Sequence, residues 1–299
     1  MKKTDARNLH IKIFVKDKLY PREDAKISVF DSVVQGGDAV WEGLRVYNGK
    51  IFALDLHLKR LAESAKAMMF ENVPDPGWIK QKIFETLKAN GMKDGVHIRL
   101  TLTRGEKITS GMSPEFNQSG CSLIVLAEWK EPVYPSEGIT LISSSIRRNN
   151  PQFVDSKIHH NNLINNILAK IQANLAGAGD ALMLDMNGFV SETNATNIFM
   201  IKEGRVFTPF ADSCLPGITR GIVIDICKEN NIPVFEKNIS LTELYNADEV
   251  FTTGTMGELT PVLSIDGRMI VPPADSTLLK TLQKYYTEKT ITYGEPLLF

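Results

Sequence analysis

Apolar residues recur along the chain with two periods. Alternation of apolar and polar positions predicts strands at 26–30, 43–47, 50–53, 96–103 and 121–127. Asn48 and Gly49 form a dipeptide typical of a hairpin turn between two of these strands. Spacings of three and four residues predict helices at 55–69, with Asp55 as the N-cap, and at 78–89, ended by Asn90 and Gly91.

The pattern after residue 138 predicts strands and helices in mixed order. Strands are expected at 139–146, 181–185, 189–191, 197–201, 205–207 and 250–253, and helices at 161–173 and 218–229. Because strands and helices alternate without a regular βαβ rhythm, the predicted fold class is α+β. Two prolines in the polar segment 129–135 favour a linker. We therefore expect a smaller α+β domain at 1–128, a linker at 129–138 and a larger domain at 139–299.

The amino-acid composition limits which partners and which cellular compartment are expected for the protein. Of 299 residues, 43% are apolar and 23% charged, so a sizeable core can be buried. The formal net charge is -1 and the sequence has no basic block, so neither nucleic acid nor a membrane is expected as a partner. A small-molecule substrate is expected instead. Three cysteines argue against a disulfide framework, and no apolar segment predicts secretion or a membrane span. We expect the cytoplasm as the location.

Common cofactor and metal motifs do not occur in the sequence. A P-loop, a dinucleotide-binding glycine motif, a zinc-protease helix and a nucleophile elbow are all missing. His159 and His160 are adjacent, so their side chains point in different directions and make a poor metal pair. No metal site is predicted.

Three segments could bind a polar ligand, and each also has a purely structural explanation. Residues 215–220 (Leu-Pro-Gly-Ile-Thr-Arg) place a turn before a helix, where the N–H groups of Ile218 and Thr219 could bind phosphate, or could simply begin a helix. The turn at 254–257 could bind a carboxylate through its N–H groups, or be an ordinary β-turn. Glu192 begins a polar insert at 192–197, which could line a polar site or be a solvent-facing hairpin.

These segments occur together with a lysine in an order that resembles a known family. The pattern comprises Lys157 with Asn161, Asp185-x-x-Gly188-x-x-x-Glu192, Asn197-x-Phe199, Thr208-Pro209, Leu215 to Arg220, Ala247-Asp-Glu249 and Gly254-Thr255. It resembles the class IV aminotransferases, which are pyridoxal-phosphate (PLP) enzymes of fold type IV, over roughly residues 25–270. The segments 35–43, 147–149, 155–162, 190–197 and 253–258 look like the D-amino acid aminotransferase or branched-chain-aminotransferase-like subgroup. The resemblance implies a two-domain, D-amino acid aminotransferase-like fold with PLP bound to the larger domain.

The resemblance also implies roles for cofactor-binding residues. Lys157 would form the Schiff base with PLP and move the substrate's α-proton. Glu192 would pair with the pyridine nitrogen and keep it protonated. The phosphate would be bound by Arg60, Ile218, Thr219 and Thr255, next to Leu215. Arg60 could instead be an exposed helix charge.

The substrate side of the implied site departs from ordinary branched-chain enzymes. The N–H groups of Thr255 and Met256 would bind the substrate carboxylate, with Arg99 as a second clamp or, alternatively, in a structural ion pair. Trp41 stands where Phe or Tyr is usual in the pocket wall. Asn162 stands where branched-chain enzymes carry Tyr, and a contact between Asn162 and the cofactor is left open.

The function implied is transamination from an amino acid, with a D-amino acid favoured, to a 2-oxo acid such as 2-oxoglutarate or pyruvate. The alternatives are a branched-chain L-amino acid aminotransferase, an aminodeoxychorismate lyase that needs no amino acceptor, and a non-catalytic PLP-binding protein. The family forms homodimers whose two subunits complete each site, so a homodimer is expected.

Overall fold

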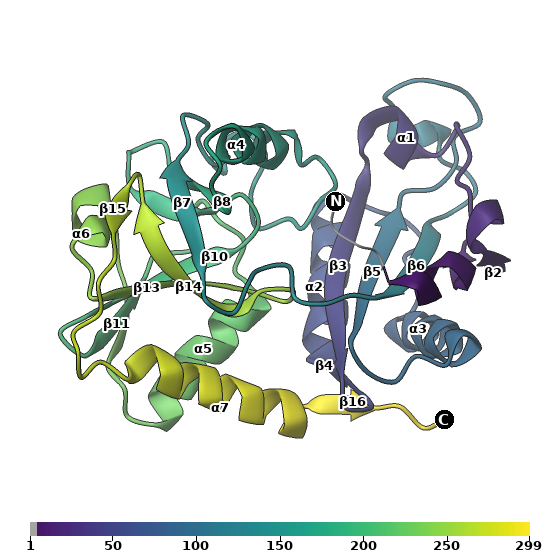
Figure 1. Ribbon diagram of the computed structural model, residues 1–299. Helices are drawn as coiled ribbons and strands as arrows, with labels where there is room; N and C mark the ends of the chain where they lie inside the picture. Colours follow the sequence, from purple (N-terminus) through teal and green to yellow (C-terminus); the bar gives the residue numbers. More distant parts are fainter. Residues whose placement is uncertain (1–4) are drawn as a thin grey trace. The chain divides into compact units, whose positions relative to one another are not determined.

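The computed structural model describes residues 5–299 as two compact units (Figure 1). Unit 1 contains the chain up to Glu131 together with Ile158–Asn162 and Thr290–Phe299, and unit 2 contains Pro132–Lys157 and Leu163–Lys289. The chain therefore passes from unit 1 to unit 2 inside the predicted linker at 129–138. The predicted larger domain, 139–299, includes two short segments that the structure groups with unit 1, Ile158–Asn162 and Thr290–Phe299. The last one belongs there because its strand pairs with a strand of unit 1. The remaining domain boundaries stay a prediction.

Unit 1 is built on an antiparallel sheet of seven strands in the order β16-β4-β3-β5-β6-β1-β2. Its strands are β1 (Lys12–Val15), β2 (Lys18–Pro21), β3 (Ala39–Tyr47), β4 (Lys50–Phe52), β5 (Val96–Thr103), β6 (Ser122–Trp129) and β16 (Gly294–Pro296). Its helices are α1 (Ser32–Gly36), α2 (Leu54–Ala67) and α3 (Pro76–Asn90), with short 3-10 turns η1 (Ala6–His10), η2 (Arg22–Asp24) and η3 (Pro114–Phe116). α2 packs against β3, and α3 packs against β1 and β6.

Local chemistry explains where these elements begin. α3 is capped at its start by Asp75, whose carboxylate accepts from the N–H of Gly77, and at its end by Gly91 in the left-handed region (φ 64°). The predicted cap of α2 is wrong: the helix begins after Ala53, and Asp55 lies in its first turn. The predicted strand at 26–30 is also wrong. The Ser28 hydroxyl there accepts from the N–H of Phe30 and its carbonyl from that of Asp31, which makes a local turn.

Unit 2 contains a mixed sheet of nine strands in the order β12-β11-β10-β13-β14-β7-β8-β9, with β15 paired to β14. Its strands are β7 (Ile139–Ser143), β8 (Asp180–Leu184), β9 (Val190–Thr193), β10 (Asn197–Lys202), β11 (Arg205–Thr208), β12 (Val234–Glu236), β13 (Glu249–Gly254), β14 (Glu258–Ile265) and β15 (Arg268–Met269). Its helices are α4 (Ile164–Leu175), α5 (Ile218–Glu229), α6 (Leu241–Tyr245) and α7 (Leu278–Thr292, within this unit to Lys289). β14, β7 and β8 run parallel to one another.

One antiparallel sheet and one mixed sheet, each with its own helices, confirm the predicted α+β class. Among residues 5–299, no helix has the length and apolar character required to cross a bilayer.

Candidate functional site

A buried carboxylate lies at the centre of the predicted cofactor residues of unit 2. Glu192 on β9 is only 5% exposed. Its Oε1 lies 2.7 Å from Arg148 Nη2, and its Oε2 accepts from Asn197 Nδ2 at 3.0 Å. Burial raises the pKa of Glu192, while the charge of Arg148 and a backbone hydrogen bond from Leu215 oppose that rise. Both carboxylate oxygens are therefore held in place by donors of the same unit.

The start of α5 is joined to this carboxylate by one side chain. Asn197 Nδ2 also donates to the Leu215 carbonyl at 2.8 Å. A Cβ on Gly217 would collide with Asn197 Oδ1, so the approach requires glycine. Gly217 is the N-cap of α5 and offers no capping side chain. The first N–H groups of the helix, those of Ile218 and Thr219, thus form a positive end suited to a phosphate.

A tight turn between β13 and β14 carries the other predicted backbone donors. The N–H of Gly257 donates to the Gly254 carbonyl at 3.2 Å, which closes the turn. Directly before the turn, the buried Thr253 hydroxyl has no hydrogen-bond partner within residues 5–299. Thr253 is paired in register with Asn197. A buried, unsatisfied hydroxyl beside this turn is what a site for a hydrogen-bonding ligand requires.

Lys157 is exposed in unit 2. Its Nζ donates to the Asp212 carbonyl at 3.2 Å and lies 3.8 Å from Asp155 Oδ1. The side chain is 44% exposed, so the amine can be reached by a carbonyl compound. With this exposed amine, the buried acid and the uncapped helix, the residues of unit 2 fit the carbonyl, pyridine nitrogen and phosphate of PLP.

Arg60 belongs to a buried charged cluster of unit 1. Its Nε and Nη2 donate to the two oxygens of Glu42 at 2.8 and 2.7 Å. Glu42 is fully buried, and its oxygens also contact His57 Nδ1 at 2.7 Å and His159 Nδ1 at 3.2 Å. Arg60 is therefore not an exposed helix charge, because its guanidinium is fixed by a bidentate pair.

Burial and charge separate the pKa values of this cluster. Burial alone would raise the pKa of Glu42, but the facing His159 and the hydrogen bonds from Arg60, His159 and His57 hold it well below its usual range. Burial lowers the pKa of His57, and lowers that of His159 to about 4. The cluster therefore combines an ionised carboxylate and guanidinium with two neutral imidazoles at pH 7.

Arg99 and Trp41 lie together on the sheet of unit 1. The guanidinium carbon of Arg99 lies 3.3 Å from the centre of the Trp41 ring, and the His159 ring lies against Trp41, tilted by 38°, with 4.0 Å between centroids. Arg99 Nη2 donates to Asn161 Oδ1 at 3.2 Å. Within residues 5–299 Arg99 forms no ion pair, and burial lowers its pKa to about 10. The charge of Glu42 opposes this lowering, but the hydrogen-bond and ring partners of Arg99 are neutral, so this half-buried cation is suited to a carboxylate ligand.

Asn162 contacts the end of α1 in unit 1. Its Nδ2 donates to the Gly37 carbonyl at 3.1 Å, and its backbone N–H donates to His160 Nδ1 at 3.1 Å. The predicted site residues thus fall into two sets: Trp41, Arg60, Arg99 and Asn162 in unit 1, and Lys157, Glu192, Leu215, Ile218, Thr219, Thr255 and Met256 in unit 2.

The sequence reasoning assigned no role to several residues that hold these side chains. They are Glu42, His57 and His159 in unit 1, and Arg148 and Asn197 in unit 2. Two adjacent arginines, Arg147 and Arg148, were visible, and a buried Glu192 requires a cation. That requirement could have suggested the pair, but not which arginine is buried.

Comparisons with known proteins identify the family to which the chain is similar. The model of the amino-transferase class IV family matches residues 39–265. The branched-chain-amino-acid aminotransferase-like protein 2 of Arabidopsis thaliana is 59% identical over 291 residues, 97% of this chain. The chain spans only 52% of that relative's length. A D-alanine aminotransferase of Listeria monocytogenes is 32% identical over 97% of this chain and 99% of its own.

A solved structure of an aminotransferase has a similar fold. The branched-chain aminotransferase of the thermophilic archaeon Thermoproteus uzoniensis, solved with norvaline, superimposes with a TM-score of 0.88 and 29% identity. The match covers 96% of this chain and 99% of that chain.

Proposed function

The chain belongs to the class IV aminotransferase family, whose members depend on PLP, and from this premise we propose that it is a transaminase. One observation carries the proposal. Asn197 joins a buried acid, Glu192, to the uncapped start of α5, so an acceptor for a protonated nitrogen and an anion site are held as one piece. The pyridine nitrogen and the phosphate of PLP require these two groups.

When bound, PLP supplies a carbonyl that reacts with amines and a ring that withdraws electrons from the substrate α-carbon. The Lys157 amine would attach the cofactor covalently and carry the proton to and from that carbon. Glu192 would accept a hydrogen bond from the ring nitrogen. Ile218 and Thr219 at the start of α5, beside Leu215, would bind the phosphate together with Thr255.

On the basis of the family resemblance, we also propose roles for residues of unit 1. Arg60 would bind the phosphate, with Glu42 fixing the plane of its guanidinium. Arg99 would bind a substrate carboxylate with the N–H groups of Thr255 and Met256, and Trp41 would shape the pocket. A contact of Asn162 with the cofactor remains part of the proposal.

A D-amino acid is the proposed donor, with 2-oxoglutarate or pyruvate as acceptor. The similarity to D-alanine aminotransferase supports it. A branched-chain L-amino acid donor is the second candidate, because the names of the Arabidopsis relative and of the Thermoproteus enzyme refer to branched-chain substrates. Each enantiomer should be mixed separately with the holoenzyme while the cofactor absorbance and the released 2-oxo acid are measured.

Loss of the bound-cofactor absorbance with D-amino acids alone supports the first candidate, and loss with L-leucine or L-valine supports the second. Pyruvate released from aminodeoxychorismate without an amino acceptor would instead indicate a lyase. The variant Lys157→Ala should release no oxo acid, whereas Lys284→Ala, which removes an exposed lysine of α7, should behave like the wild type. Full activity of Lys157→Ala would contradict the proposal.

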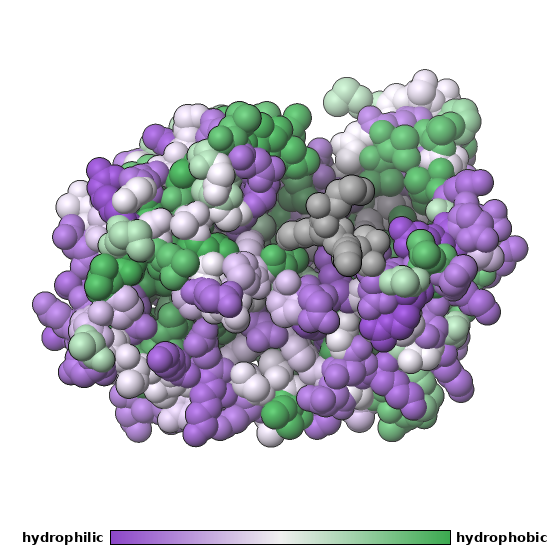
Figure 2. Space-filling view, viewed as in Figure 1, coloured by the Kyte–Doolittle hydropathy of each residue, from purple (hydrophilic) through white to green (hydrophobic). Residues whose placement is uncertain are grey.

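A homodimer is also proposed, and α4 supports it. Ile164, Ile167, Leu168, Ile171 and Leu175 are each 43–85% exposed and occupy positions i, i+3, i+4, i+7 and i+11 of the helix, and we call them the α4 stripe. Figure 2 shows the resulting apolar patch over α4. A continuous apolar helix face is rare on a monomer, and a second copy can cover it about a two-fold axis.

A further inference from the structure

The turn at 254–257 rests on the segment that enters unit 2. The N–H of Val133 donates to the Met256 carbonyl at 3.1 Å. The next residue, Tyr134, lies against Gly257: a Cβ built on this glycine would be 2.7 Å from Cδ2 and 2.8 Å from Cε2 of the ring. Cβ atoms essentially never approach other atoms closer than 3.0 Å. The Tyr134 ring therefore occupies the space that any side chain at position 257 would need.

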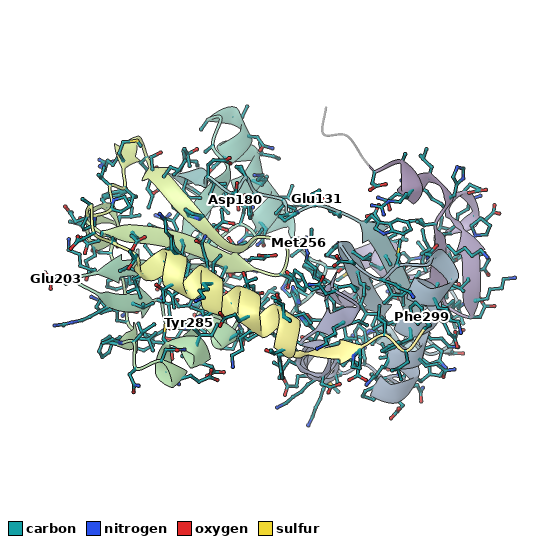
Figure 3. All side chains as sticks on the ribbon, turned by 60° about the horizontal axis from the view of Figure 1, so that its bottom comes forward. Glu131, Asp180, Glu203, Met256, Tyr285 and Phe299 are labelled. Atoms are coloured by element: carbon teal, nitrogen blue, oxygen red, sulfur yellow. The ribbon has the colours of Figure 1, made fainter. Side chains whose placement is uncertain are left out.

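Tyr134 is itself fixed at the end of the sheet. Its hydroxyl donates to the carboxylate of Asp180, the first residue of β8, and Asp180 is paired with Lys170 at 2.9 Å. Tyr134 thereby links Asp180, at the start of β8, to the turn that contains Met256; Figure 3 labels both residues. The sheet thus holds the ring from one side, and the ring meets the turn on the other.

The two ends of the turn have further supports. Thr260 Oγ1 donates to the Gly257 carbonyl at 2.6 Å. A Cβ on Gly254 would lie 3.0 Å from Thr196 Cγ2, so that glycine is also closely packed. The turn therefore has little freedom to move without displacing Tyr134 or Thr196.

We propose that Tyr134 is a positioning residue that fixes the N–H groups of Thr255 and Met256 for the substrate carboxylate. The inference rests on the proposed function, which makes this turn the carboxylate site. The amino acid and the 2-oxo acid both carry that carboxylate. A displaced turn therefore weakens the binding of both substrates. The chemistry at Lys157 is affected less, because Tyr134 does not contact that residue through any hydrogen bond of the described chain.

Steric complementation tests the proposal. Gly257→Ala should raise KM for both the amino acid and the 2-oxo acid about ten-fold, because a small misplacement of binding groups is costly. It should also weaken the binding of 4-methylvalerate, a carboxylate without an amino group, to the holoenzyme by a similar factor. Adding Tyr134→Ala removes the collision. The double variant should therefore bind 4-methylvalerate no worse than Tyr134→Ala alone. Gly221→Ala on α5 has open space around it and is the matched control.

The outcomes separate this inference from the proposed function. Wild-type affinity of Gly257→Ala for 4-methylvalerate would overturn the role of Tyr134. So would losses of affinity in the two single variants that simply add up in the double variant. If Gly257→Ala does not fold, recovery of folding in the double variant supports the collision, and failure of both contradicts it. A wild-type holoenzyme that transaminates no amino acid would refute the proposed function instead, while the coupling of Gly257 and Tyr134 remains measurable by thermal unfolding.

Discussion

Glu192 and Arg148 form an ion pair inside unit 2, with 2.7 Å between Oε1 and Nη2 and each side chain less than 10% exposed. Breaking such a pair leaves one charge buried without compensation, which costs about 3–5 kcal/mol. We expect Arg148→Met to lower the free energy of unfolding by that amount at pH 7.5. Denaturant unfolding measures it, with the exposed neighbour Arg147→Met as the control, for which about 0.5 kcal/mol or less is expected.

The same variant has a predicted pH dependence. Burial raises the pKa of Glu192 in the folded protein above that in the unfolded chain. The folded state then binds the proton more tightly, so stability falls as pH rises between the two pKa values. Without Arg148 the folded pKa rises further. Arg148→Met should therefore recover part of its lost stability when the pH is lowered from 7.5 toward 5, and a constant deficit would show that Glu192 does not titrate there.

Asn197→Ala should weaken PLP binding about ten-fold, because it removes the donor to Glu192 Oε2 and leaves the Leu215 carbonyl without the same donor. Fluorescence titration of the apoprotein with PLP measures the affinity. Asn197→Asp keeps the shape but places a second carboxylate beside Glu192, so it should be worse than alanine. Asn246→Ala, an exposed asparagine of the same unit, is the control. Equal affinities for all four proteins would remove Asn197 from the cofactor site.

The sequence predicted best the elements whose pattern is local. α3 ends where Asn90 and Gly91 indicated, since a glycine in the left-handed region stops a helix by itself. The strand at 26–30 failed because the turn hydrogen bonds of Ser28 compete with a strand, and an apolar residue such as Val29 is left 71% exposed. α7 was missed, although its buried Leu279, Leu282 and Tyr286 follow helical spacing.

For the candidate site, the sequence predicted the motif residues but not the residues that hold them in place. Lys157, Glu192 and the start of α5 could be named because the family motif places them at fixed spacings. The partners that hold them come from distant positions: Glu42 lies 18 residues before Arg60, and Tyr134 lies 46 residues before Asp180. Such pairs form only when the sheets assemble, so no local pattern predicts them.

The α4 stripe gives a prediction about assembly. Ile167→Glu combined with Ile171→Glu places two charges on a face that the proposed second copy would bury, which disfavours association strongly. Light scattering after size exclusion should show a dimer for the wild type and a monomer for this variant. Val271→Glu adds a charge at a 72% exposed position off the stripe and should remain a dimer. A dimeric double variant would place the interface elsewhere.

His159 makes unit 1 sensitive to acid. Burial lowers the pKa of His159 to about 4, whereas its value in the unfolded chain is near the ordinary 6.5. Between these values the unfolded chain binds the proton and the folded protein does not, so the free energy of unfolding falls as the pH drops. Lowering the pH from 7.5 to 5 should cost about 2 kcal/mol through this residue. His159→Gln should lose that part of the slope, and His10→Gln, at an exposed position, should keep it. If His159→Gln instead became less stable than the wild type only at low pH, His159 would be protonated beside Glu42, and the neutral imidazole inferred for the cluster would be wrong.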